Sequence, residues 1–170
     1  MDIDELISIV TLKKLEDNKF EGQNYKTVWG RIFGGQVLSQ SLHAAYQTVP
    51  ENRIAHSMHA YFILPGDLNE PVIYEVDNIR KGGSFTTRRV VAFQKGRAIF
   101  NMAASFQKDE EGFDHQIQMP NVLSPDLLLT DFEQAEKFKE ELAERYQIFL
   151  AAHPKVFDFK PVGTNIFLRK

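Results

Sequence analysis

The sequence predicts an α+β fold in which an antiparallel sheet wraps around one long central helix. The helix is expected over the stretch that begins at Phe33 and ends at Pro50, where apolar residues recur at helical spacing. This stretch contains no Asp, Glu, Lys or Arg, so the helix lacks the charged face that a surface helix presents to water. Between residues 54 and 107, by contrast, apolar and polar residues alternate in runs separated by short turns, which is typical of an antiparallel meander. We therefore expect the helix to be buried against the sheet.

The segment before the central helix is predicted to form a short helix and a strand. Residues 2–15 have an amphipathic helical pattern, and Asp17 and Asn18 are typical turn residues ahead of a strand over residues 19–25. A glycine-bearing loop over residues 30–35 then leads into the central helix. The first backbone N–H groups of that helix have no partners within the helix and can bind other acceptors.

Four strands are predicted after the central helix. They cover residues 54–64, 72–80, 84–94 and 97–107. Pro65, Gly66 and Asp67 form a turn after the first strand, and Lys95 with Gly96 closes a tight hairpin before the last. Beyond the sheet, residues 113–129 are predicted to be an extended crossing segment, followed by an amphipathic helix that ends at residue 152.

Composition excludes several classes of function. With 170 residues and a net charge of −3, the chain suits one globular domain and has no basic excess to attract nucleic acid or an anionic membrane. The absence of cysteine excludes disulfides, thiolate metal sites and cysteine nucleophiles. The N-terminal sequence lacks the pattern of a signal peptide and no apolar run is long enough to span a membrane. We expect a cytoplasmic protein that needs no cofactor.

Five segments resemble type II acyl-CoA thioesterases, the TesB-like family, and keep their order from residue 20 to residue 116. They are FEGQNY (20–25), RIFGGQVLSQSL (31–42), AHSMHAYFILPGD (55–67), IYEVDNIRKGGSFTTRRVVAFQKGRAIFNMAASFQ (73–107) and GFDHQ (112–116). The resemblance implies a hotdog fold, the antiparallel sheet around a central helix expected above. It also implies hydrolysis of fatty acyl-CoA to a free fatty acid and CoA.

The resemblance further implies a particular domain organisation. Members of this family carry two hotdog units in one polypeptide, so residues 1–112 would be the first unit, 113–155 a crossing linker with an amphipathic helix, and 156–170 the start of a truncated second unit. The catalytic Asp, Ser or Thr, and Gln of the family would lie beyond Lys170. We expect acyl-CoA as the substrate and, as the protein partner, either a second hotdog unit or another copy of the chain.

Gln40 and His56 are the candidate catalytic residues. When the two hotdog units are compared as repeats, the catalytic Asp of the second unit falls opposite Gln40 on the central helix. An amide cannot act as a general base, so the first unit would supply half of the double sheet, the interface and part of the acyl-binding tunnel. The alternation of the first meander strand places His56 on one face with Met58 and Phe62, where it is either a structural histidine or a general base. His59 would point to the opposite face, which excludes a metal pair.

The candidate substrate-binding residues lie at turns and at the start of the central helix. The N–H groups of Gly34, Gly35 and Gln36 would polarise a thioester carbonyl, or the glycines would only permit close packing. Lys81, in a Lys-Gly-Gly turn, and Arg88 would contact the CoA phosphates, although such a turn is first of all a hairpin loop.

Three functions remain open on the sequence alone. The chain is half of an acyl-CoA thioesterase that needs a second unit, a homodimeric hotdog thioesterase, or an acyl-binding module without catalysis. The central helix carries no carboxylate, and a homodimer would therefore have a poor catalytic site.

Overall fold

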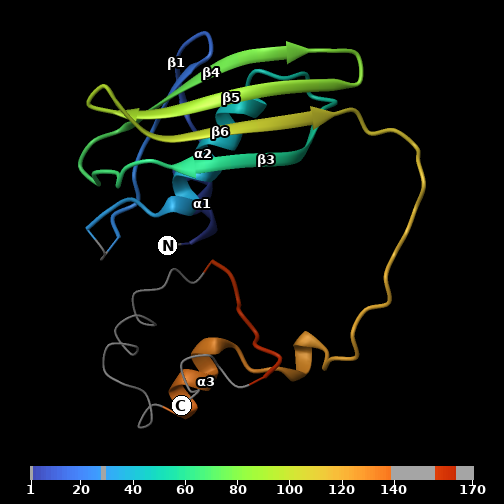
Figure 1. Ribbon diagram of the computed structural model, residues 1–170. Helices are drawn as coiled ribbons and strands as arrows, with labels where there is room; N and C mark the ends of the chain where they lie inside the picture. The colour runs from blue at the N-terminus through green and yellow to red at the C-terminus, as the bar shows by residue number, and fades with distance from the viewer. Residues whose placement is uncertain (1, 28–29, 139–155, 164–170) are drawn as a thin grey trace. The chain divides into compact units, whose positions relative to one another are not determined.

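The computed structural model describes residues 2–27, 30–138 and 156–163. The chain divides into two compact units, one spanning Asp4–Gly112 and the other taking in the described residues from Phe113 onward. The unit over Asp4–Gly112 contains the sheet and its helices (Figure 1).

The sheet has six strands in the order β1-β2-β4-β5-β6-β3, and all neighbours are antiparallel. The strands are β1 (Lys13–Glu16), β2 (Lys19–Gly22), β3 (Ile54–Phe62), β4 (Val72–Lys81), β5 (Phe85–Gln94) and β6 (Arg97–Gln107). Helix α2 (Gly34–Tyr46) lies along one face of the sheet (Figure 1). The expected antiparallel sheet against a central helix is confirmed, but only β4, β5 and β6 form a meander, because β3 pairs with β6 and not with β4 as the sequence predicted. Residues 13–15, expected to be helical, instead form part of a strand after α1 (Ile3–Val10).

The core forms between α2 and the alternate residues of the sheet that face it. Alternate side chains are buried along β5, along most of β6 and in the first half of β4, among them Tyr74, Val90 and Met102. Small and polar residues of α2, including Ser41, Ala44 and Ala45, pack against them, because a thin helix face lets the sheet approach closely. We call the sheet surface that faces α2 the inner face and the opposite surface the outer face.

Helix α2 departs from the sequence prediction in two respects. It ends at Tyr46, four residues before Pro50, because the Thr48 hydroxyl bonds the carbonyl of Ala45 at 2.8 Å and the chain turns there. Burial is also one-sided: within the described chain Leu38 and Leu42 are only partly buried, and Tyr46 is exposed.

The two edges of the sheet differ in chemistry. Strand β1 is short, fully exposed and charged, with the sequence KKLE. Among the strands that the structure describes, β3 pairs with β6 alone, and it exposes apolar side chains along its nine residues. Charged, short edges resist pairing with other chains, and long apolar edges favour it. The β3 edge is therefore the one suited to a partner.

The second unit contains the short helices η1 (Pro125–Leu127) and α3 (Asp131–Lys137). A capping box begins α3: the Thr130 hydroxyl accepts a hydrogen bond from the backbone N–H of Glu133, whose carboxylate accepts one from the backbone N–H of Thr130. The rest of the helix expected up to residue 152 lies outside the described residues. None of the described helices is long and apolar enough to cross a membrane.

Candidate functional site

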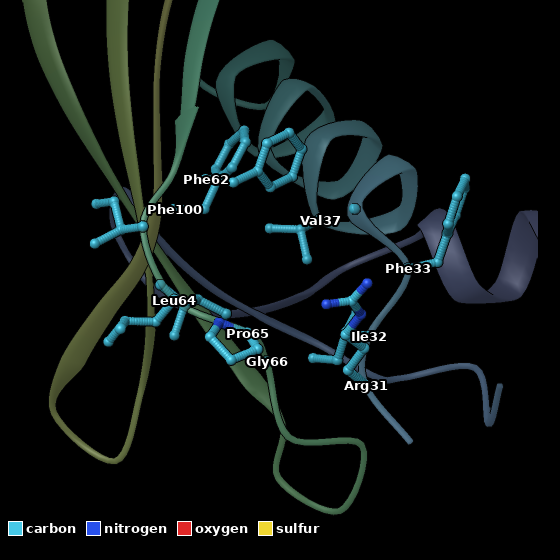
Figure 2. A pocket seen from close by; sticks show the side chains of 12 residues that line it. Arg31, Ile32, Phe33, Val37, Phe62, Leu64, Pro65, Gly66 and Phe100 are labelled. Carbon is cyan, nitrogen blue, oxygen red and sulfur yellow. The ribbon is translucent and has the colours of Figure 1, made fainter. Parts of the chain in front are cut away.

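A cavity of about 530 Å³ lies at the N-terminal end of α2 (Figure 2). It is lined by the loop that leads into α2, by the end of β3 with the following turn, and by two residues of β6. The lining residues are Arg31, Ile32, Phe33, Gly34, Val37, Phe62, Ile63, Leu64, Pro65, Gly66, Ile99 and Phe100. A backbone hydrogen bond of 3.1 Å from Ile32 N to Gly66 O joins the two loops, so the cavity wall is held by both sides.

Gly34 and Gly35 permit the aromatic walls to approach the start of the helix. A Cβ on Gly34 would lie 2.9 Å from Phe62 Cε1, and one on Gly35 would clash with the ring of Phe33. Their backbone N–H groups have no protein acceptor in the described part of the chain. These glycines therefore combine close packing with two unpaired donors at the positive end of a helix dipole.

Gln36, in contrast, is fully engaged within the protein. Its N–H donates to Phe33 O at 3.0 Å, and its side-chain Oε1 accepts from Tyr25 N at 3.0 Å. The amide Nε2 donates to Gln23 O and Asn24 Oδ1. Gln36 thus fixes the segment after β2 against α2, and contrary to expectation it is not a free donor for a thioester.

Gln40 is completely buried and makes three short hydrogen bonds. Its Nε2 donates to Ile9 O at 2.6 Å and Gln23 O at 2.9 Å, and the Tyr74 hydroxyl donates to its Oε1 at 2.6 Å. Burial raises the pKa of Tyr74, which keeps that phenol a donor. A Cβ on Gly22 would lie 2.8 Å from Gln40 Cδ, so a larger residue there would displace the Gln40 amide from its hydrogen bonds. Gln40 does not line the cavity and ties α1, β2 and β4 to the central helix.

His56 does not share a face with Met58 and Phe62, which corrects the prediction from the alternating pattern. A bulge between Ala55 and Ser57 interrupts the register of β3 with β6. His56 Nε2 lies 2.8 Å from the Ser105 hydroxyl, on the outer face, and its ring meets Phe85 edge to face at 5.7 Å.

The bulge has a consequence for both histidines of β3. Met58 and Phe62 pair with inner-face residues of β6, so His59 lies on the outer face together with His56 rather than opposite it. Gln40, on α2, lies on the inner side of the sheet. The structure therefore does not bring His56 and Gln40 together.

The Lys-Gly-Gly turn is organised around an arginine that sequence reasoning missed. Arg53 is buried, and its guanidinium donates to the carbonyls of Gly82, Gly83 and Ser84. The turn thus directs its carbonyl oxygens at a cation rather than its N–H groups at an anion, which supports the hairpin-loop interpretation. Lys81 itself is exposed.

Arg88 is also a structural residue. It is 2% exposed, and it donates to Thr48 Oγ1 and Thr48 O at 2.8 Å, and to the carbonyls of Arg80 and Thr87 at 2.9 and 3.0 Å. Burial lowers the pKa of the guanidinium. Contrary to expectation, Arg88 is not available to CoA phosphates, because all of its nitrogens hold the end of α2 against β4 and β5.

Asp67, expected to be a turn residue, behaves as one. Its carboxylate accepts from Asn69 N at 2.9 Å and pairs with Lys95 at 3.1 Å, and these bonds hold its pKa below the usual range. The buried Gln94 bonds the backbone of the same turn through both atoms of its amide.

Comparison with known proteins agrees with this geometry. Residues 24–107 match the acyl-CoA thioesterase N-terminal domain. Acyl-CoA thioesterase 2 of Haemophilus influenzae is 41% identical over 142 residues, which are 84% of this chain and 50% of the relative. The chain belongs to the acyl-CoA thioesterase family. It spans about half the length of the curated thioesterases that it matches.

Solved structures of thioesterases show the same fold. The acyl-CoA thioesterase II TesB2 of Mycobacterium marinum matches with a TM-score of 0.66 and 42% identity, over 78% of this chain and 48% of that one. A protein of unknown function with a hot dog fold from Alicyclobacillus acidocaldarius matches with a TM-score of 0.64 at 22% identity, over 74% and 48% of the two chains. The hotdog architecture expected from the sequence is confirmed.

Proposed function

We propose that this chain is the N-terminal hotdog half of an enzyme that hydrolyses fatty acyl-CoA to a fatty acid and CoA. Membership of the thioesterase family carries the proposal. The cavity supports it, because its lining is mainly aliphatic and aromatic and because Gly34, whose N–H group has no acceptor in the described part of the chain, lies at one end. Such donors stabilise the negative charge that develops on a thioester oxygen during attack by water.

The general base must come from outside this cavity. Among the described lining residues there is no Asp, Glu or His, and Gln40 and His56 lie elsewhere. The attacking water needs a general base that takes its proton, and such a base typically raises the rate by about 100- to 10,000-fold. The proposed organisation therefore has residues 1–112 as the first hotdog unit, 113–155 as a crossing linker and 156–170 as the start of a second unit that brings the base.

The β3 edge is the proposed surface for the second hotdog unit or for another copy of the chain. Met58, Phe62 and Ile63 are 41%, 62% and 47% exposed along or just after this edge. Pairing there would cover these side chains and place a second subunit beside the cavity, which Phe62 and Ile63 line. A cavity without a base equally suits an acyl-binding module, which is the alternative function. The cytoplasmic location remains a prediction.

Hydrolysis and binding assays together test these functions. The purified chain and the full-length Haemophilus relative are compared with a long-chain acyl-CoA, and binding is measured with the non-hydrolysable thioether analogue. We expect the chain to bind the analogue and to hydrolyse the thioester at least about 100-fold more slowly than the relative. Full activity would refute the half-enzyme proposal, absence of measurable hydrolysis with tight binding would favour the binding module, and absence of both would refute the thioesterase assignment of this cavity.

A further inference from the structure

Arg31 is the one ionisable residue among the described residues that line the cavity. Figure 2 shows its guanidinium directed towards Val37 and the first turn of α2. The other lining residues are glycine, proline, aliphatic or phenylalanine. Arg31 is itself exposed to solvent, so a cation stands at the open side of an otherwise apolar cavity, close to the start of α2, where Gly34 forms part of the lining.

The guanidinium of Arg31 has no partner in the described part of the chain, and three other arginines of the same unit contrast with it. Arg53 and Arg88 are buried and bonded to oxygen atoms of neighbouring loops and strands. Arg89, on the outer face, forms a 3.0 Å ion pair with Asp77. Only the backbone carbonyl of Arg31 is engaged, by the hydroxyl of Thr27 at 2.7 Å. The side chain is thus free to bind an anion.

The walls of the cavity indicate what that anion carries. Phe62 packs on Phe100 with ring centroids 5.0 Å apart, and together with Leu64 and Val37 they offer carbon surface only. The volume of about 530 Å³ lies within the usual range of small-molecule sites, about 300–1,000 Å³. Apolar walls with a single cationic end match a ligand that has one anionic head and a hydrocarbon tail.

We propose that this cavity binds a fatty acid anion, with the carboxylate on Arg31 and on the N–H group of Gly34, and with the hydrocarbon chain against Phe62, Leu64 and Phe100. The inference deepens the proposed function, since a fatty acid is the product of thioester hydrolysis. It does not depend on catalysis, however, because binding of a free acid requires neither a general base nor a second unit. Arg31 is then a residue that retains product and distinguishes the free acid from neutral acyl compounds.

Calorimetric titration of the 170-residue chain with octanoate and with octan-1-ol at neutral pH tests the proposal. The two ligands share a chain length and differ in charge. We expect octanoate to bind about 10- to 100-fold more tightly than octan-1-ol, as charge-assisted hydrogen bonds would give. Arg31→Gln should abolish this difference and leave octan-1-ol binding unchanged. Arg89→Gln, which removes an equal charge from the outer face, should preserve the difference.

Several results would overturn the proposal. They are equal affinity for both ligands, no binding of octanoate, or a preference for octanoate that survives Arg31→Gln. A further titration with CoA alone tests whether Arg31 binds the carboxylate of a fatty acid or the phosphates of CoA. We expect CoA not to displace octanoate. Displacement at similar concentrations would assign the cavity to CoA instead. Because neither octanoate nor octan-1-ol is a thioester, these outcomes are independent of any hydrolysis assay.

Discussion

At the residue scale, the decisive positions are polar side chains that are buried and fully bonded. Gln36, Gln40 and Arg88 were all candidates for substrate chemistry, and each uses its polar atoms within the fold. A buried polar group that loses its partner costs about 1–3 kcal/mol, so these contacts are structural constraints. The residues left for ligand chemistry are Arg31 and Gly34, which line the cavity and have polar groups without a partner in the described part of the chain.

Gln40→Leu tests the structural role of the buried amide. The substitution leaves the carbonyls of Ile9 and Gln23 and the hydroxyl of Tyr74 without their partner. We expect the free energy of unfolding to fall by about 2–4 kcal/mol, measured by urea denaturation. Gln118→Leu, at an exposed position, is the control and should change stability by less than about 0.5 kcal/mol. Equal stability of the two variants would contradict the role assigned to Gln40.

His56→Ala tests the position of the outer-face histidine. Since His56 bonds Ser105 and contacts Phe85 on the face of the sheet opposite α2, we expect the residual hydrolysis rate of the chain to stay within about twofold of the original. The assay is steady-state release of CoA from a long-chain acyl-CoA. A loss of about 100-fold or more, the size of a general-base contribution, would make His56 the base after all.

At the element scale, β3 and α3 show how single segments prepare the chain for interactions. Strand β3 combines a bulge, which turns His56 to the outer face, with an unpaired apolar edge. Helix α3 begins with a capping box whose hydrogen bonds are made by Thr130 and Glu133. A single substitution should perturb the β3 edge, and a change of pH should perturb the capping box of α3.

The β3 edge predicts self-association of the chain. We expect a dimer at micromolar concentration in sedimentation velocity, because pairing of two β3 edges would cover Met58 and Phe62. Met58→Lys places a charge on this edge and should shift the distribution towards monomer. Lys14→Glu, on the charged β1 edge at the other side of the sheet, should leave it unchanged. A clean monomer of the unsubstituted chain would contradict the prediction.

The start of α3 should respond to acid. Hydrogen bonds from the backbone and the hydroxyl of Thr130 lower the pKa of Glu133 from its model-compound value of 4.5. Because the pKa of Glu133 is lower in the folded state, the ionised carboxylate stabilises the cap fully above pH 4.5. This stabilisation is lost as the pH falls through the folded-state pKa, where the carboxylate becomes protonated. Nuclear magnetic resonance shifts of Thr130 and Glu133 should report fraying of the first turn below that pH. In Glu133→Gln the same signals should be independent of pH, and an equal response in both proteins would exclude this carboxylate as the cause.

At the scale of the whole molecule, the sequence predicts the architecture better than the site. The uncharged stretch from Phe33 predicts the central helix and the alternating runs predict the strands, because burial of a helix and a half-buried sheet leave periodic signatures. The place of β3 beside β6 was not predicted, because alternation within a strand does not indicate which strand lies next to it. The bulge in β3 adds one residue to the strand, so the residues before and after it do not follow one continuous alternation between the two faces. The alternation of residues 54–64 in the sequence does not reveal this bulge. Arg53 and Arg88 bond to distant backbone carbonyls, which carry no signal in the side-chain sequence, so their burial was not predictable.

The close contact between Gly22 and Gln40 also limits how a catalytic carboxylate could be engineered into this chain. Replacing Gln40 by Asp would introduce the acid that the family resemblance predicts opposite this position, but a carboxylate cannot donate hydrogen bonds to the carbonyls of Ile9 and Gln23 and would be repelled by them. Productive redesign must therefore rebuild the surroundings together with the residue, by opening the contact at Gly22 and giving those two carbonyls new donors. The route from a binding half to an active half thus passes through several coordinated substitutions rather than one.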